Sequence, residues 1–500
     1  MSQSSRLFSF ASLLLLAAAP AFAQTPAPDQ PAPPAEPTPP TPPTPPTPPP
    51  PPTPAPAVVI VAPTPPPEAK KPVADVTPTV VKGKTELTFY GFAQMYGIYD
   101  STQGLNEQEQ NTAIARPNTY TGDHGQTTFS ARHSRFGFKL SRPVTDDIKA
   151  SGQFEMDFLN TQPAGFTEAQ FFQNPTMRFR HLYLKLETPV VDVLAGQYWG
   201  LFGWQSTFHP NSVEIQGLPA QVYSRIPQLR FSKTIKGGAV DVEVALAVAR
   251  PPQRASATPD GQVGVKLAFN KLKGWRTKGA ADSGIETAAI GVSGIGRRFA
   301  VDEFSANPSN QVVTYGYGVS IDALVPLIPA TKDSHANALT LTGSFVTGQG
   351  IADQYNGLSF GVSNPALPNP GMTTPAPVYT PNIDNALAMF SVDAGVATLH
   401  AIQVTSYMAG LQYYLPTSAK VWVAANFGHI SSDNAEKFGN TAKIWNKSTF
   451  VDANLFYDLI PAVRLGAEVS LNDQSFVAAD AKGEHDAKNY RAMGTMLFMF

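Results

Sequence analysis

The most constraining feature of this sequence is a two-residue alternation of apolar and polar side chains, which recurs in short segments over 86–500. In one such segment, Val242 and Val244 alternate with Asp241 and Glu243. Successive side chains of a β-strand point to opposite faces of the sheet, so each segment predicts a strand with one apolar and one polar face. We find no 3.6-residue helical period over any useful length.

The length of these segments separates two kinds of all-β fold. Soluble strands average about 5–6 residues, whereas a tilted strand needs about 9–11 residues to cross a bilayer. The segments here have the longer span, and their polar faces often carry glycine, serine or a full charge. Short connections also alternate with long ones, as in barrels with short turns at one end and long loops at the other. The sequence therefore favours an all-β fold, a transmembrane antiparallel β-barrel, over a soluble β-sandwich.

We predict sixteen strands, an even number that puts both ends of the barrel on the periplasmic side, with fourteen or eighteen left open. The strands are expected at 86–98, 129–141, 148–158, 176–187, 192–199, 223–233, 239–249, 261–270, 285–297, 312–324, 337–347, 400–414, 420–430, 448–459, 463–472 and 488–500. Two connections expected on the periplasmic side, 271–284 and 325–336, are unusually long. Within 176–187 the alternation changes face, which indicates a β-bulge.

The N-terminal part has a different character. Residues 1–23 carry Arg6, an apolar run and small residues before Gln24, which predicts a cleaved secretory signal peptide; a short membrane anchor is the alternative. Residues 24–85 are expected to be a linker, of which 25–78 is proline-rich, and proline's fixed φ and missing N–H prevent helix or sheet over 25–78. We expect either a disordered linker or a semi-rigid polyproline II stalk in the periplasm. Residues 86–500 are the barrel domain.

Composition excludes several other classes of protein. The chain has no cysteine, which excludes a disulfide-stapled fold, a cysteine-ligated metal and a cysteine nucleophile. Its formal net charge of −2 and the lack of a nucleic-acid motif argue against nucleic acid as a partner. The eight histidines lack metal-binding spacing, and no G-x-S-x-G elbow occurs. We therefore predict no enzyme activity, metal or cofactor.

Several motifs resemble the trimeric outer-membrane porins of Gram-negative bacteria, and among them the DcaP-like branch. They are the opening LTFYGFAQMYGIYD, the stretches SRFGFKLSRPVTDDIKASGQFEMDF and RFRHLYLKLETPVVDVLAGQYWGLFG, and a last strand that ends on Phe500. The resemblance implies a homotrimer and an assembly signal at Phe498 and Phe500, read by the barrel-assembly machinery. It also implies that loop 200–222, with Trp204, His209 and Glu214, folds into the pore. The DcaP-like branch carries a coiled coil before its barrel, whereas this chain has the proline-rich segment.

Charged residues on the polar faces are expected to line the pore, because a charge on the lipid face costs about 2–4 kcal/mol near the midplane for Arg or Lys. The basic candidates are Arg135, Lys139, Lys149, Arg178, Arg180, Lys185, Arg225, Arg464 and Arg491. The acidic candidates are Asp241, Glu243, Asp322, Asp452 and Asp458. The strands that carry basic residues near the beginning and near the end of the barrel sequence become neighbours when the barrel closes. We therefore predict a basic wall that faces an acidic one.

These features predict a porin, a water-filled channel for passive diffusion of small hydrophilic solutes across the outer membrane. The basic wall and the shortage of acids in loop 200–222 suggest a weak preference for anionic organic acids; the alternative is that these charges merely solvate the lumen. A different class is a structural anchor, in which the barrel tethers the membrane to peptidoglycan or another periplasmic partner through 25–78. A barrel-embedded hydrolase would need an outward-facing Ser–His pair, and this sequence shows none.

Overall fold

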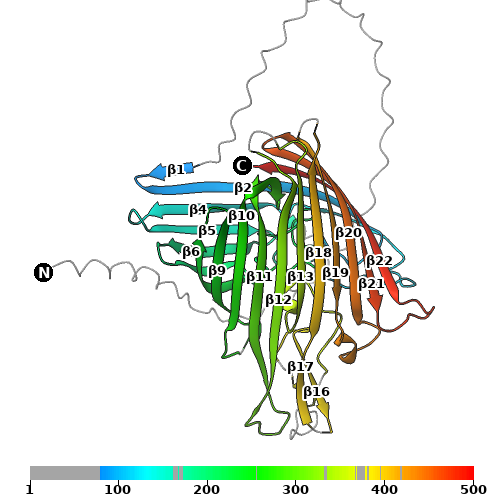
Figure 1. The fold of residues 1–500 in the computed structure, drawn as a ribbon. Coiled ribbons are helices and arrows are strands. Elements are labelled where there is room, and N and C mark those ends of the chain that lie inside the picture. The colour runs from blue at the N-terminus through cyan, green and yellow to red at the C-terminus, as the bar shows by residue number, and fades with distance from the viewer. Residues whose placement is uncertain are drawn as a thin grey trace, which may run out of the picture. The chain divides into compact units, whose positions relative to one another are not determined.

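The chain forms a closed antiparallel barrel of sixteen strands in this computed structural model (Figure 1). The structure describes residues 79–161, 173–254, 256–331, 335–365, 382–394, 396–416 and 419–500, with short pieces at 167, 367–368 and 378–379. The predicted signal peptide and nearly all of the proline-rich segment lie outside the described residues, so the interpretations placed on them stay predictions.

The barrel wall confirms the predicted strand pattern, since each of the sixteen expected strands overlaps an observed one. The wall strands are β2 (Thr85–Asp100), β3 (Gln126–Ser130) with β4 (Arg135–Pro143), β5 (Lys149–Asp157), β6 (Arg178–Glu187), β7 (Asp192–Trp199), β8 (Arg225–Ile235), β9 (Val240–Ala249), β10 (Asp260–Lys278), β11 (Asp282–Asp302), β12 (Gln311–Ile328), β13 (Leu339–Gln349), β18 (Gln403–Tyr414), β19 (Val421–Ser431), β20 (Trp445–Ile460), β21 (Val463–Phe476) and β22 (Asp486–Met499).

The remaining elements are small. They are β1 (Thr79–Lys82), η1 (Ala352–Gln354), β14 (Leu367–Pro368), β15 (Val378–Tyr379), β16 (Ala388–Asp393), β17 (Val396–Ala401) and η2 (Ala435–Lys437). No helix in the described ranges is long and apolar enough to cross a membrane.

The structure corrects the sequence-based prediction in two places. The strand predicted at 129–141 is interrupted: β3 and β4 both pair with β2, and residues 131–134 separate them. The long connections predicted at 271–284 and 325–336 are largely strand, because β10 runs to Lys278, β11 begins at Asp282 and β12 runs to Ile328. Apolar and polar residues alternate only weakly in both stretches, so the sequence pattern did not indicate strands there.

The barrel closes where the first and last wall strands meet. β2 pairs with β22 from Phe92 opposite Met499 to Asp100 opposite Arg491, and Gly91 and Phe500 exchange two backbone hydrogen bonds of 3.0 Å. The pairing with β22 stops at Gly91 and does not reach the start of β2. β1 folds back and pairs with Thr85–Thr88, and an otherwise open sheet edge is covered.

The outer face of the barrel is apolar. Leu184, Val469 and Tyr490 are 71%, 61% and 58% exposed, and many other large apolar side chains on alternate positions of the wall are exposed too. A surface of this kind is stable against lipid rather than water. Phe498 and Phe500 belong to this outer face, at the end of the last strand.

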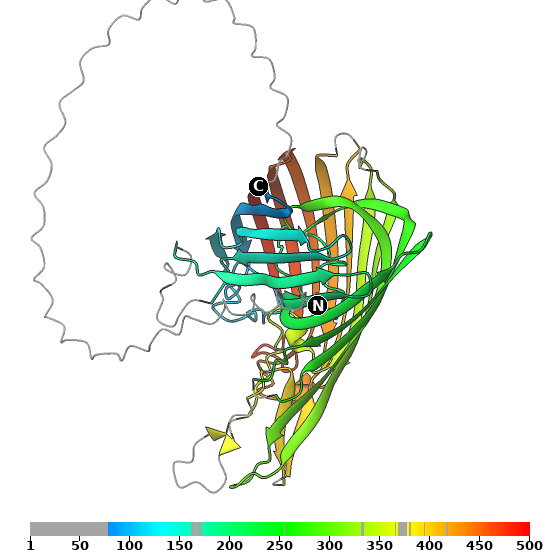
Figure 2. The ribbon, with the colours of Figure 1, turned by 90° about the vertical axis from the view of Figure 1, so that its left-hand side faces the viewer.

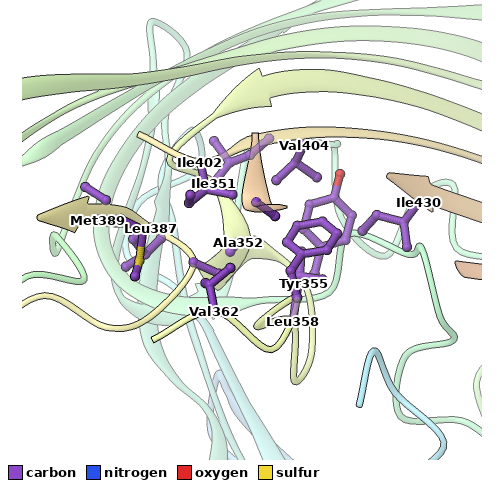
Figure 3. Packing of buried hydrophobic residues seen from close by; sticks show 14 of the residues in the cluster. Ile351, Ala352, Tyr355, Leu358, Val362, Leu387, Met389, Ile402, Val404 and Ile430 are labelled. Atoms are coloured by element: carbon purple, nitrogen blue, oxygen red, sulfur yellow. The ribbon is translucent and has the colours of Figure 1, made fainter. Parts of the chain in front are cut away.

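The two ends of the barrel differ, and we call them the long-loop end and the short-turn end. At the long-loop end, the chain that follows β13 turns inward and forms a buried apolar cluster with the wall (Figure 3). Ile351 and Tyr355 of this segment lie beside Val404 of β18 and Ile430 of β19 (Figure 3). The long loops therefore have an apolar core of their own, inside the rim of the barrel.

Candidate pore-lining site

The connection between β7 and β8, residues 200–224, enters the barrel; we call it the constriction loop. Its first part lies on β10 and β11. The amides of Leu201 and Phe202 donate to the side-chain oxygen of Gln262 at 2.8 and 2.9 Å, and the amide of Gly203 donates to Ser293 Oγ at 2.7 Å. The loop is thus bonded to inward-facing side chains of the wall.

Glycines on the inner face of the wall make room for this loop. A Cβ atom at Gly264 or Gly291 would lie 2.9 or 2.7 Å from the ring of Trp204, closer than side chains can pack. Similar crowding occurs at four further inward glycines, which meet other residues of the loop. The six glycines, here called the glycine wall, are Gly264, Gly291, Gly318, Gly410, Gly428 and Gly466. A strand glycine often marks the close approach of another segment, and it does so here on six strands.

The middle of the constriction loop reaches β2, β20 and β21. Tyr96 donates its hydroxyl to the carbonyl of Val213 at 2.8 Å, and Asn454 accepts the Val213 amide at 2.8 Å. The amide of Glu214 donates to Glu468 at 3.0 Å. The loop therefore crosses the lumen and is anchored at both sides.

The predicted bulge in β6 is present and changes what faces the lumen. Glu155 pairs with His181 and Met156 pairs with Phe179, so Arg180 is an extra residue between them. Both Arg180 and His181 are buried on the inner side, whereas Phe179 is exposed on the outer side. The bulge thus delivers two polar side chains to the same part of the lumen.

Four arginines gather around this bulge, and we call them the basic cluster: Arg135, Arg178, Arg180 and Arg225. Arg180 donates to Glu155 at 2.7 Å and to Asp157 at 3.1 Å. Arg178 binds both oxygens of Asp157, at 2.9 and 2.7 Å. The cluster thus has four guanidinium groups and only two neighbouring carboxylates, so it keeps a net positive charge.

Two members of the cluster keep unused donors. Arg135 Nε lies 3.7 Å from Glu155 without a hydrogen bond, and Arg225 Nη1 has no hydrogen-bond partner among the described residues. The Arg225 guanidinium instead lies 5.1 Å from the ring centre of Trp199. Buried donors without partners favour an anion as a companion.

A cavity of about 590 Å³ adjoins the cluster. Its lining includes the cations of Arg135, Lys139, Arg180 and Lys278, but only two carboxylates, Glu155 and Asp282. The lining also includes the aromatic side chains of Tyr90, His181, Tyr198, Trp199, His209 and Tyr223. Of the predicted basic candidates, Arg135, Lys139 and Arg180 line this cavity together; His209 was predicted in the loop, whereas Lys278 and the other aromatic residues were not predicted.

The other predicted charges lie apart from the cavity, and most have a charged partner. The pairs are Lys185–Glu187, Arg464–Asp458, Arg491–Asp100, Asp241–Lys236 and Glu243–Lys266. Asp322 accepts a hydrogen bond from Ser320 at 2.8 Å, Asp452 accepts from Asn426, and Lys149 is exposed. Local pairing neutralises most of these charges, so the excess of positive charge lies at the cavity rather than along a whole wall.

The three predicted residues of the constriction loop have different surroundings. Trp204 packs on the glycine wall and donates its ring N–H to the carbonyl of Val292 at 3.2 Å. His209 lines the cavity beside Trp199 and Tyr223, and burial together with nearby Arg276 lowers its pKa to about 3, so this imidazole is neutral. Glu214 is only 2% exposed and lies 3.7 Å from His133 and 3.9 Å from Arg491.

A buried carboxyl that the sequence did not reveal lies in the first long loop. Glu109 is fully buried and accepts a hydrogen bond from Ser470 at 2.9 Å, while its second oxygen has no partner among the described residues. Burial raises its pKa to about 7, although nearby Arg491 opposes this. No group of three or more histidine or acidic side chains in the described ranges is arranged to hold a metal ion.

Solved structures with a similar fold are bacterial outer-membrane channels. The outer membrane channel DcaP of Acinetobacter baumannii aligns over 84% of this chain and 99% of its own, with 15% identity and a TM-score of 0.57. The chain has the fold of an outer-membrane porin. OmpF of Salmonella typhi, solved in complex with daunomycin, aligns over 84% of this chain and 100% of its own, with 10% identity and a TM-score of 0.49.

At such low identity these similarities establish the fold alone. No protein-family model matches the chain, and no curated protein sequence matches it. The predicted resemblance to porins, including the DcaP branch, is therefore confirmed at the level of architecture. What the channel passes has to be argued from its own residues.

Proposed function

We propose that this protein is an outer-membrane porin that lets small hydrophilic solutes diffuse passively across the membrane. The observation that carries the proposal is the 590 Å³ polar cavity beside an inserted loop, inside a sixteen-strand barrel whose outer face is apolar. A lumen of this kind selects by its width and charge and needs no catalytic group. The porin fold supports the same conclusion.

The charge of the cavity supports a weak preference for anionic solutes such as organic acids. Four cationic side chains line it against two carboxylates, and unused donors of the basic cluster lie beside it. In a narrow, partly desolvated passage, such an excess raises the local concentration of anions over cations. The preference is weak because Arg180, the most buried of the four, already has two carboxylate partners.

The assembly of the protein is proposed on the resemblance to porins. We expect a homotrimer in outer-membrane lipid, delivered by the barrel-assembly machinery, which would recognise the last strand with Phe498 and Phe500. The proline-rich segment would extend into the periplasm, where peptidoglycan is its expected neighbour. The exposed aromatic end of β22 next to the barrel seam supports only the proposal that the last strand is recognised.

The test is the conductance of residues 24–500 in a planar bilayer, with the zero-current potential measured under a salt gradient. We expect open channels whose conductance changes in steps of three and a small potential of the sign that indicates anion preference. A potential of zero would contradict the preference and leave the channel function intact. A protein that inserts but never conducts would contradict the channel function itself.

A further inference from the structure

The hairpin of β10 and β11 leaves the barrel wall at the short-turn end. β10 pairs with β9 only as far as Phe269, and β11 pairs with β12 only from Ala289 onwards. Between these limits, Lys273–Lys278 and Asp282–Thr287 pair only with each other, after a register shift of three residues that follows Phe269. A bulge of this kind bends a hairpin, and the green strands turn across the barrel mouth towards the C-terminal end of β22 (Figure 2).

The bent hairpin crosses the lumen instead of projecting into solvent. Its Thr277 amide and carbonyl bond the side chain of Gln412 on β18, at 3.1 and 2.9 Å. At the tip, the carbonyl of Ala280 accepts a hydrogen bond of 2.8 Å from Arg464 on β21. Ala280 is 5% exposed and packs with Phe92 of β2 and Leu497 of β22. The tip therefore contacts the side of the barrel that lies opposite its origin.

The same hairpin touches the constriction loop. Asn211 donates to the carbonyl of Thr277 at 3.0 Å, and Arg276 donates to the carbonyls of Thr207 and His209 at 2.6 and 3.1 Å. Residues 278–282 line the 590 Å³ cavity together with residues of that loop. The cavity thus has the constriction loop on one side and the hairpin tip on the other.

We propose that the tip of this hairpin, Lys278–Asp282, is a second constriction of the channel, at the short-turn end; the inference rests on the proposed channel function. A solute that has passed the constriction loop and reached the cavity meets the tip before it leaves. The hydrogen bonds to Gln412, Arg464 and the constriction loop hold the tip in place, so it narrows the passage permanently rather than acting as a mobile gate.

The charges of the hairpin are paired with one another, so its role in the passage is steric. Arg276 pairs with Glu286 at 2.7 Å, Lys278 also pairs with Glu286, and Asp282 lies 3.7 Å from Lys278. These pairs leave little net charge at the tip. The hairpin therefore sets the size limit of the passage, whereas the basic cluster sets its preference for ions.

The first test replaces Lys273–Thr287 with the dipeptide asparagine–glycine, which closes the two strands near the point where they leave the wall. We expect the single-channel conductance to rise by about twofold or more, with little change in zero-current potential, because a wider passage passes more ions of both signs. An unchanged conductance would overturn the inference. A silent parent that conducts only after this replacement supports it, whereas two silent barrels overturn it together with the channel function.

A second test keeps the hairpin intact and uses the lack of native cysteines. Ala281 is exposed and lines the cavity, so Ala281→Cys offers a thiol inside the proposed constriction. Coupling to a bulky uncharged maleimide should lower conductance by about half, since the adduct fills the passage. The control is Lys236→Cys, on an exposed turn at the same end. Complete labelling at position 281 without loss of current would overturn the inference.

Discussion

The two sides of the lumen are built on opposite principles. On β4 to β8, long charged side chains fill the space next to the wall and face the cavity. On β10 to β12, β18, β19 and β21, each strand has an inward-facing glycine of the glycine wall, and the constriction loop fills the space that these glycines leave. The comparison teaches that one barrel can narrow its lumen in two ways, with side chains of the wall itself or with a loop seated on a bare wall.

The largest effect should follow from breaking the ion pairs of the charged side. Arg180→Met leaves Glu155 without its 2.7 Å partner in a buried site, which should lower the free energy of unfolding by about 3–5 kcal/mol. Urea unfolding in detergent micelles measures this change. The double variant Arg180→Met with Glu155→Gln is the control and should recover part of the loss. Equal losses in the single and double variants would show that the pair is not responsible.

A smaller effect is expected from filling the glycine side. Gly291→Leu places side-chain atoms where Trp204 and Phe208 lie, and such overpacking costs about 1–3 kcal/mol. If the loop moves away instead, the cost falls and the conductance rises. The matched control is Gly296→Leu on the same strand, where a Cβ atom meets nothing within 4 Å. Identical behaviour of the two variants, in both unfolding and conductance, would disprove the role of the glycine wall.

The smallest effect concerns Glu109, a buried carboxyl group on the side of the lumen that the constriction loop covers. Glu109 has a serine partner instead of the arginines that hold Glu155, and its folded pKa of about 7 lies above the ordinary glutamate value of about 4.5. Below pH 4.5 the carboxyl is protonated in both states; as pH rises towards 7 the unfolded state ionises first and the fold loses stability. Glu109→Gln should therefore change little at pH 4 and stabilise the barrel by about 1–2 kcal/mol at pH 8.

The control for this pH dependence is Glu303→Gln, at an exposed loop. Hydrogen bonds from the Ser309 amide and Asn310 lower the pKa of Glu303, so its contribution has the opposite sign. That contribution is present at neutral pH and is lost in acid. Unfolding midpoints measured across pH 4–8 separate the two cases, and a gain at pH 4 equal to that at pH 8 would contradict the account of Glu109.

The sequence predicted the barrel wall because apolar and polar residues alternate in each of its strands. All sixteen strands were located, and the change of face within β6 correctly indicated the bulge at Arg180. The segment 273–284, predicted as part of a long connection, was not recognised as mostly strand because it leaves the wall. Once it has no lipid-facing side, it needs no apolar stripe, and its Arg276 and Lys278 are paired inside the lumen instead.

The candidate site was less accessible to sequence reasoning. Alternation placed Arg135, Lys139 and Arg180 inside the barrel, but only folding shows that they line one cavity while Arg464 and Arg491 are paired elsewhere. The glycines on the polar faces were interpreted only as part of the strand pattern and assigned no further role. A signal was present, since inward positions occupied by glycine on several strands indicate that something else fills the lumen.

The central claim is that the cavity beside the basic cluster gives the channel its preference for anions. The most direct test is the zero-current potential of the double variant Arg135→Gln, Lys139→Gln under a gradient of dilute salt, where screening is weak. The control is Lys236→Gln, at an exposed turn, because it removes one positive charge, as each substitution of the double variant does. The account predicts that the double variant moves the potential towards cation preference while the control leaves it unchanged. A potential that stays at the parent value in the double variant would contradict the account.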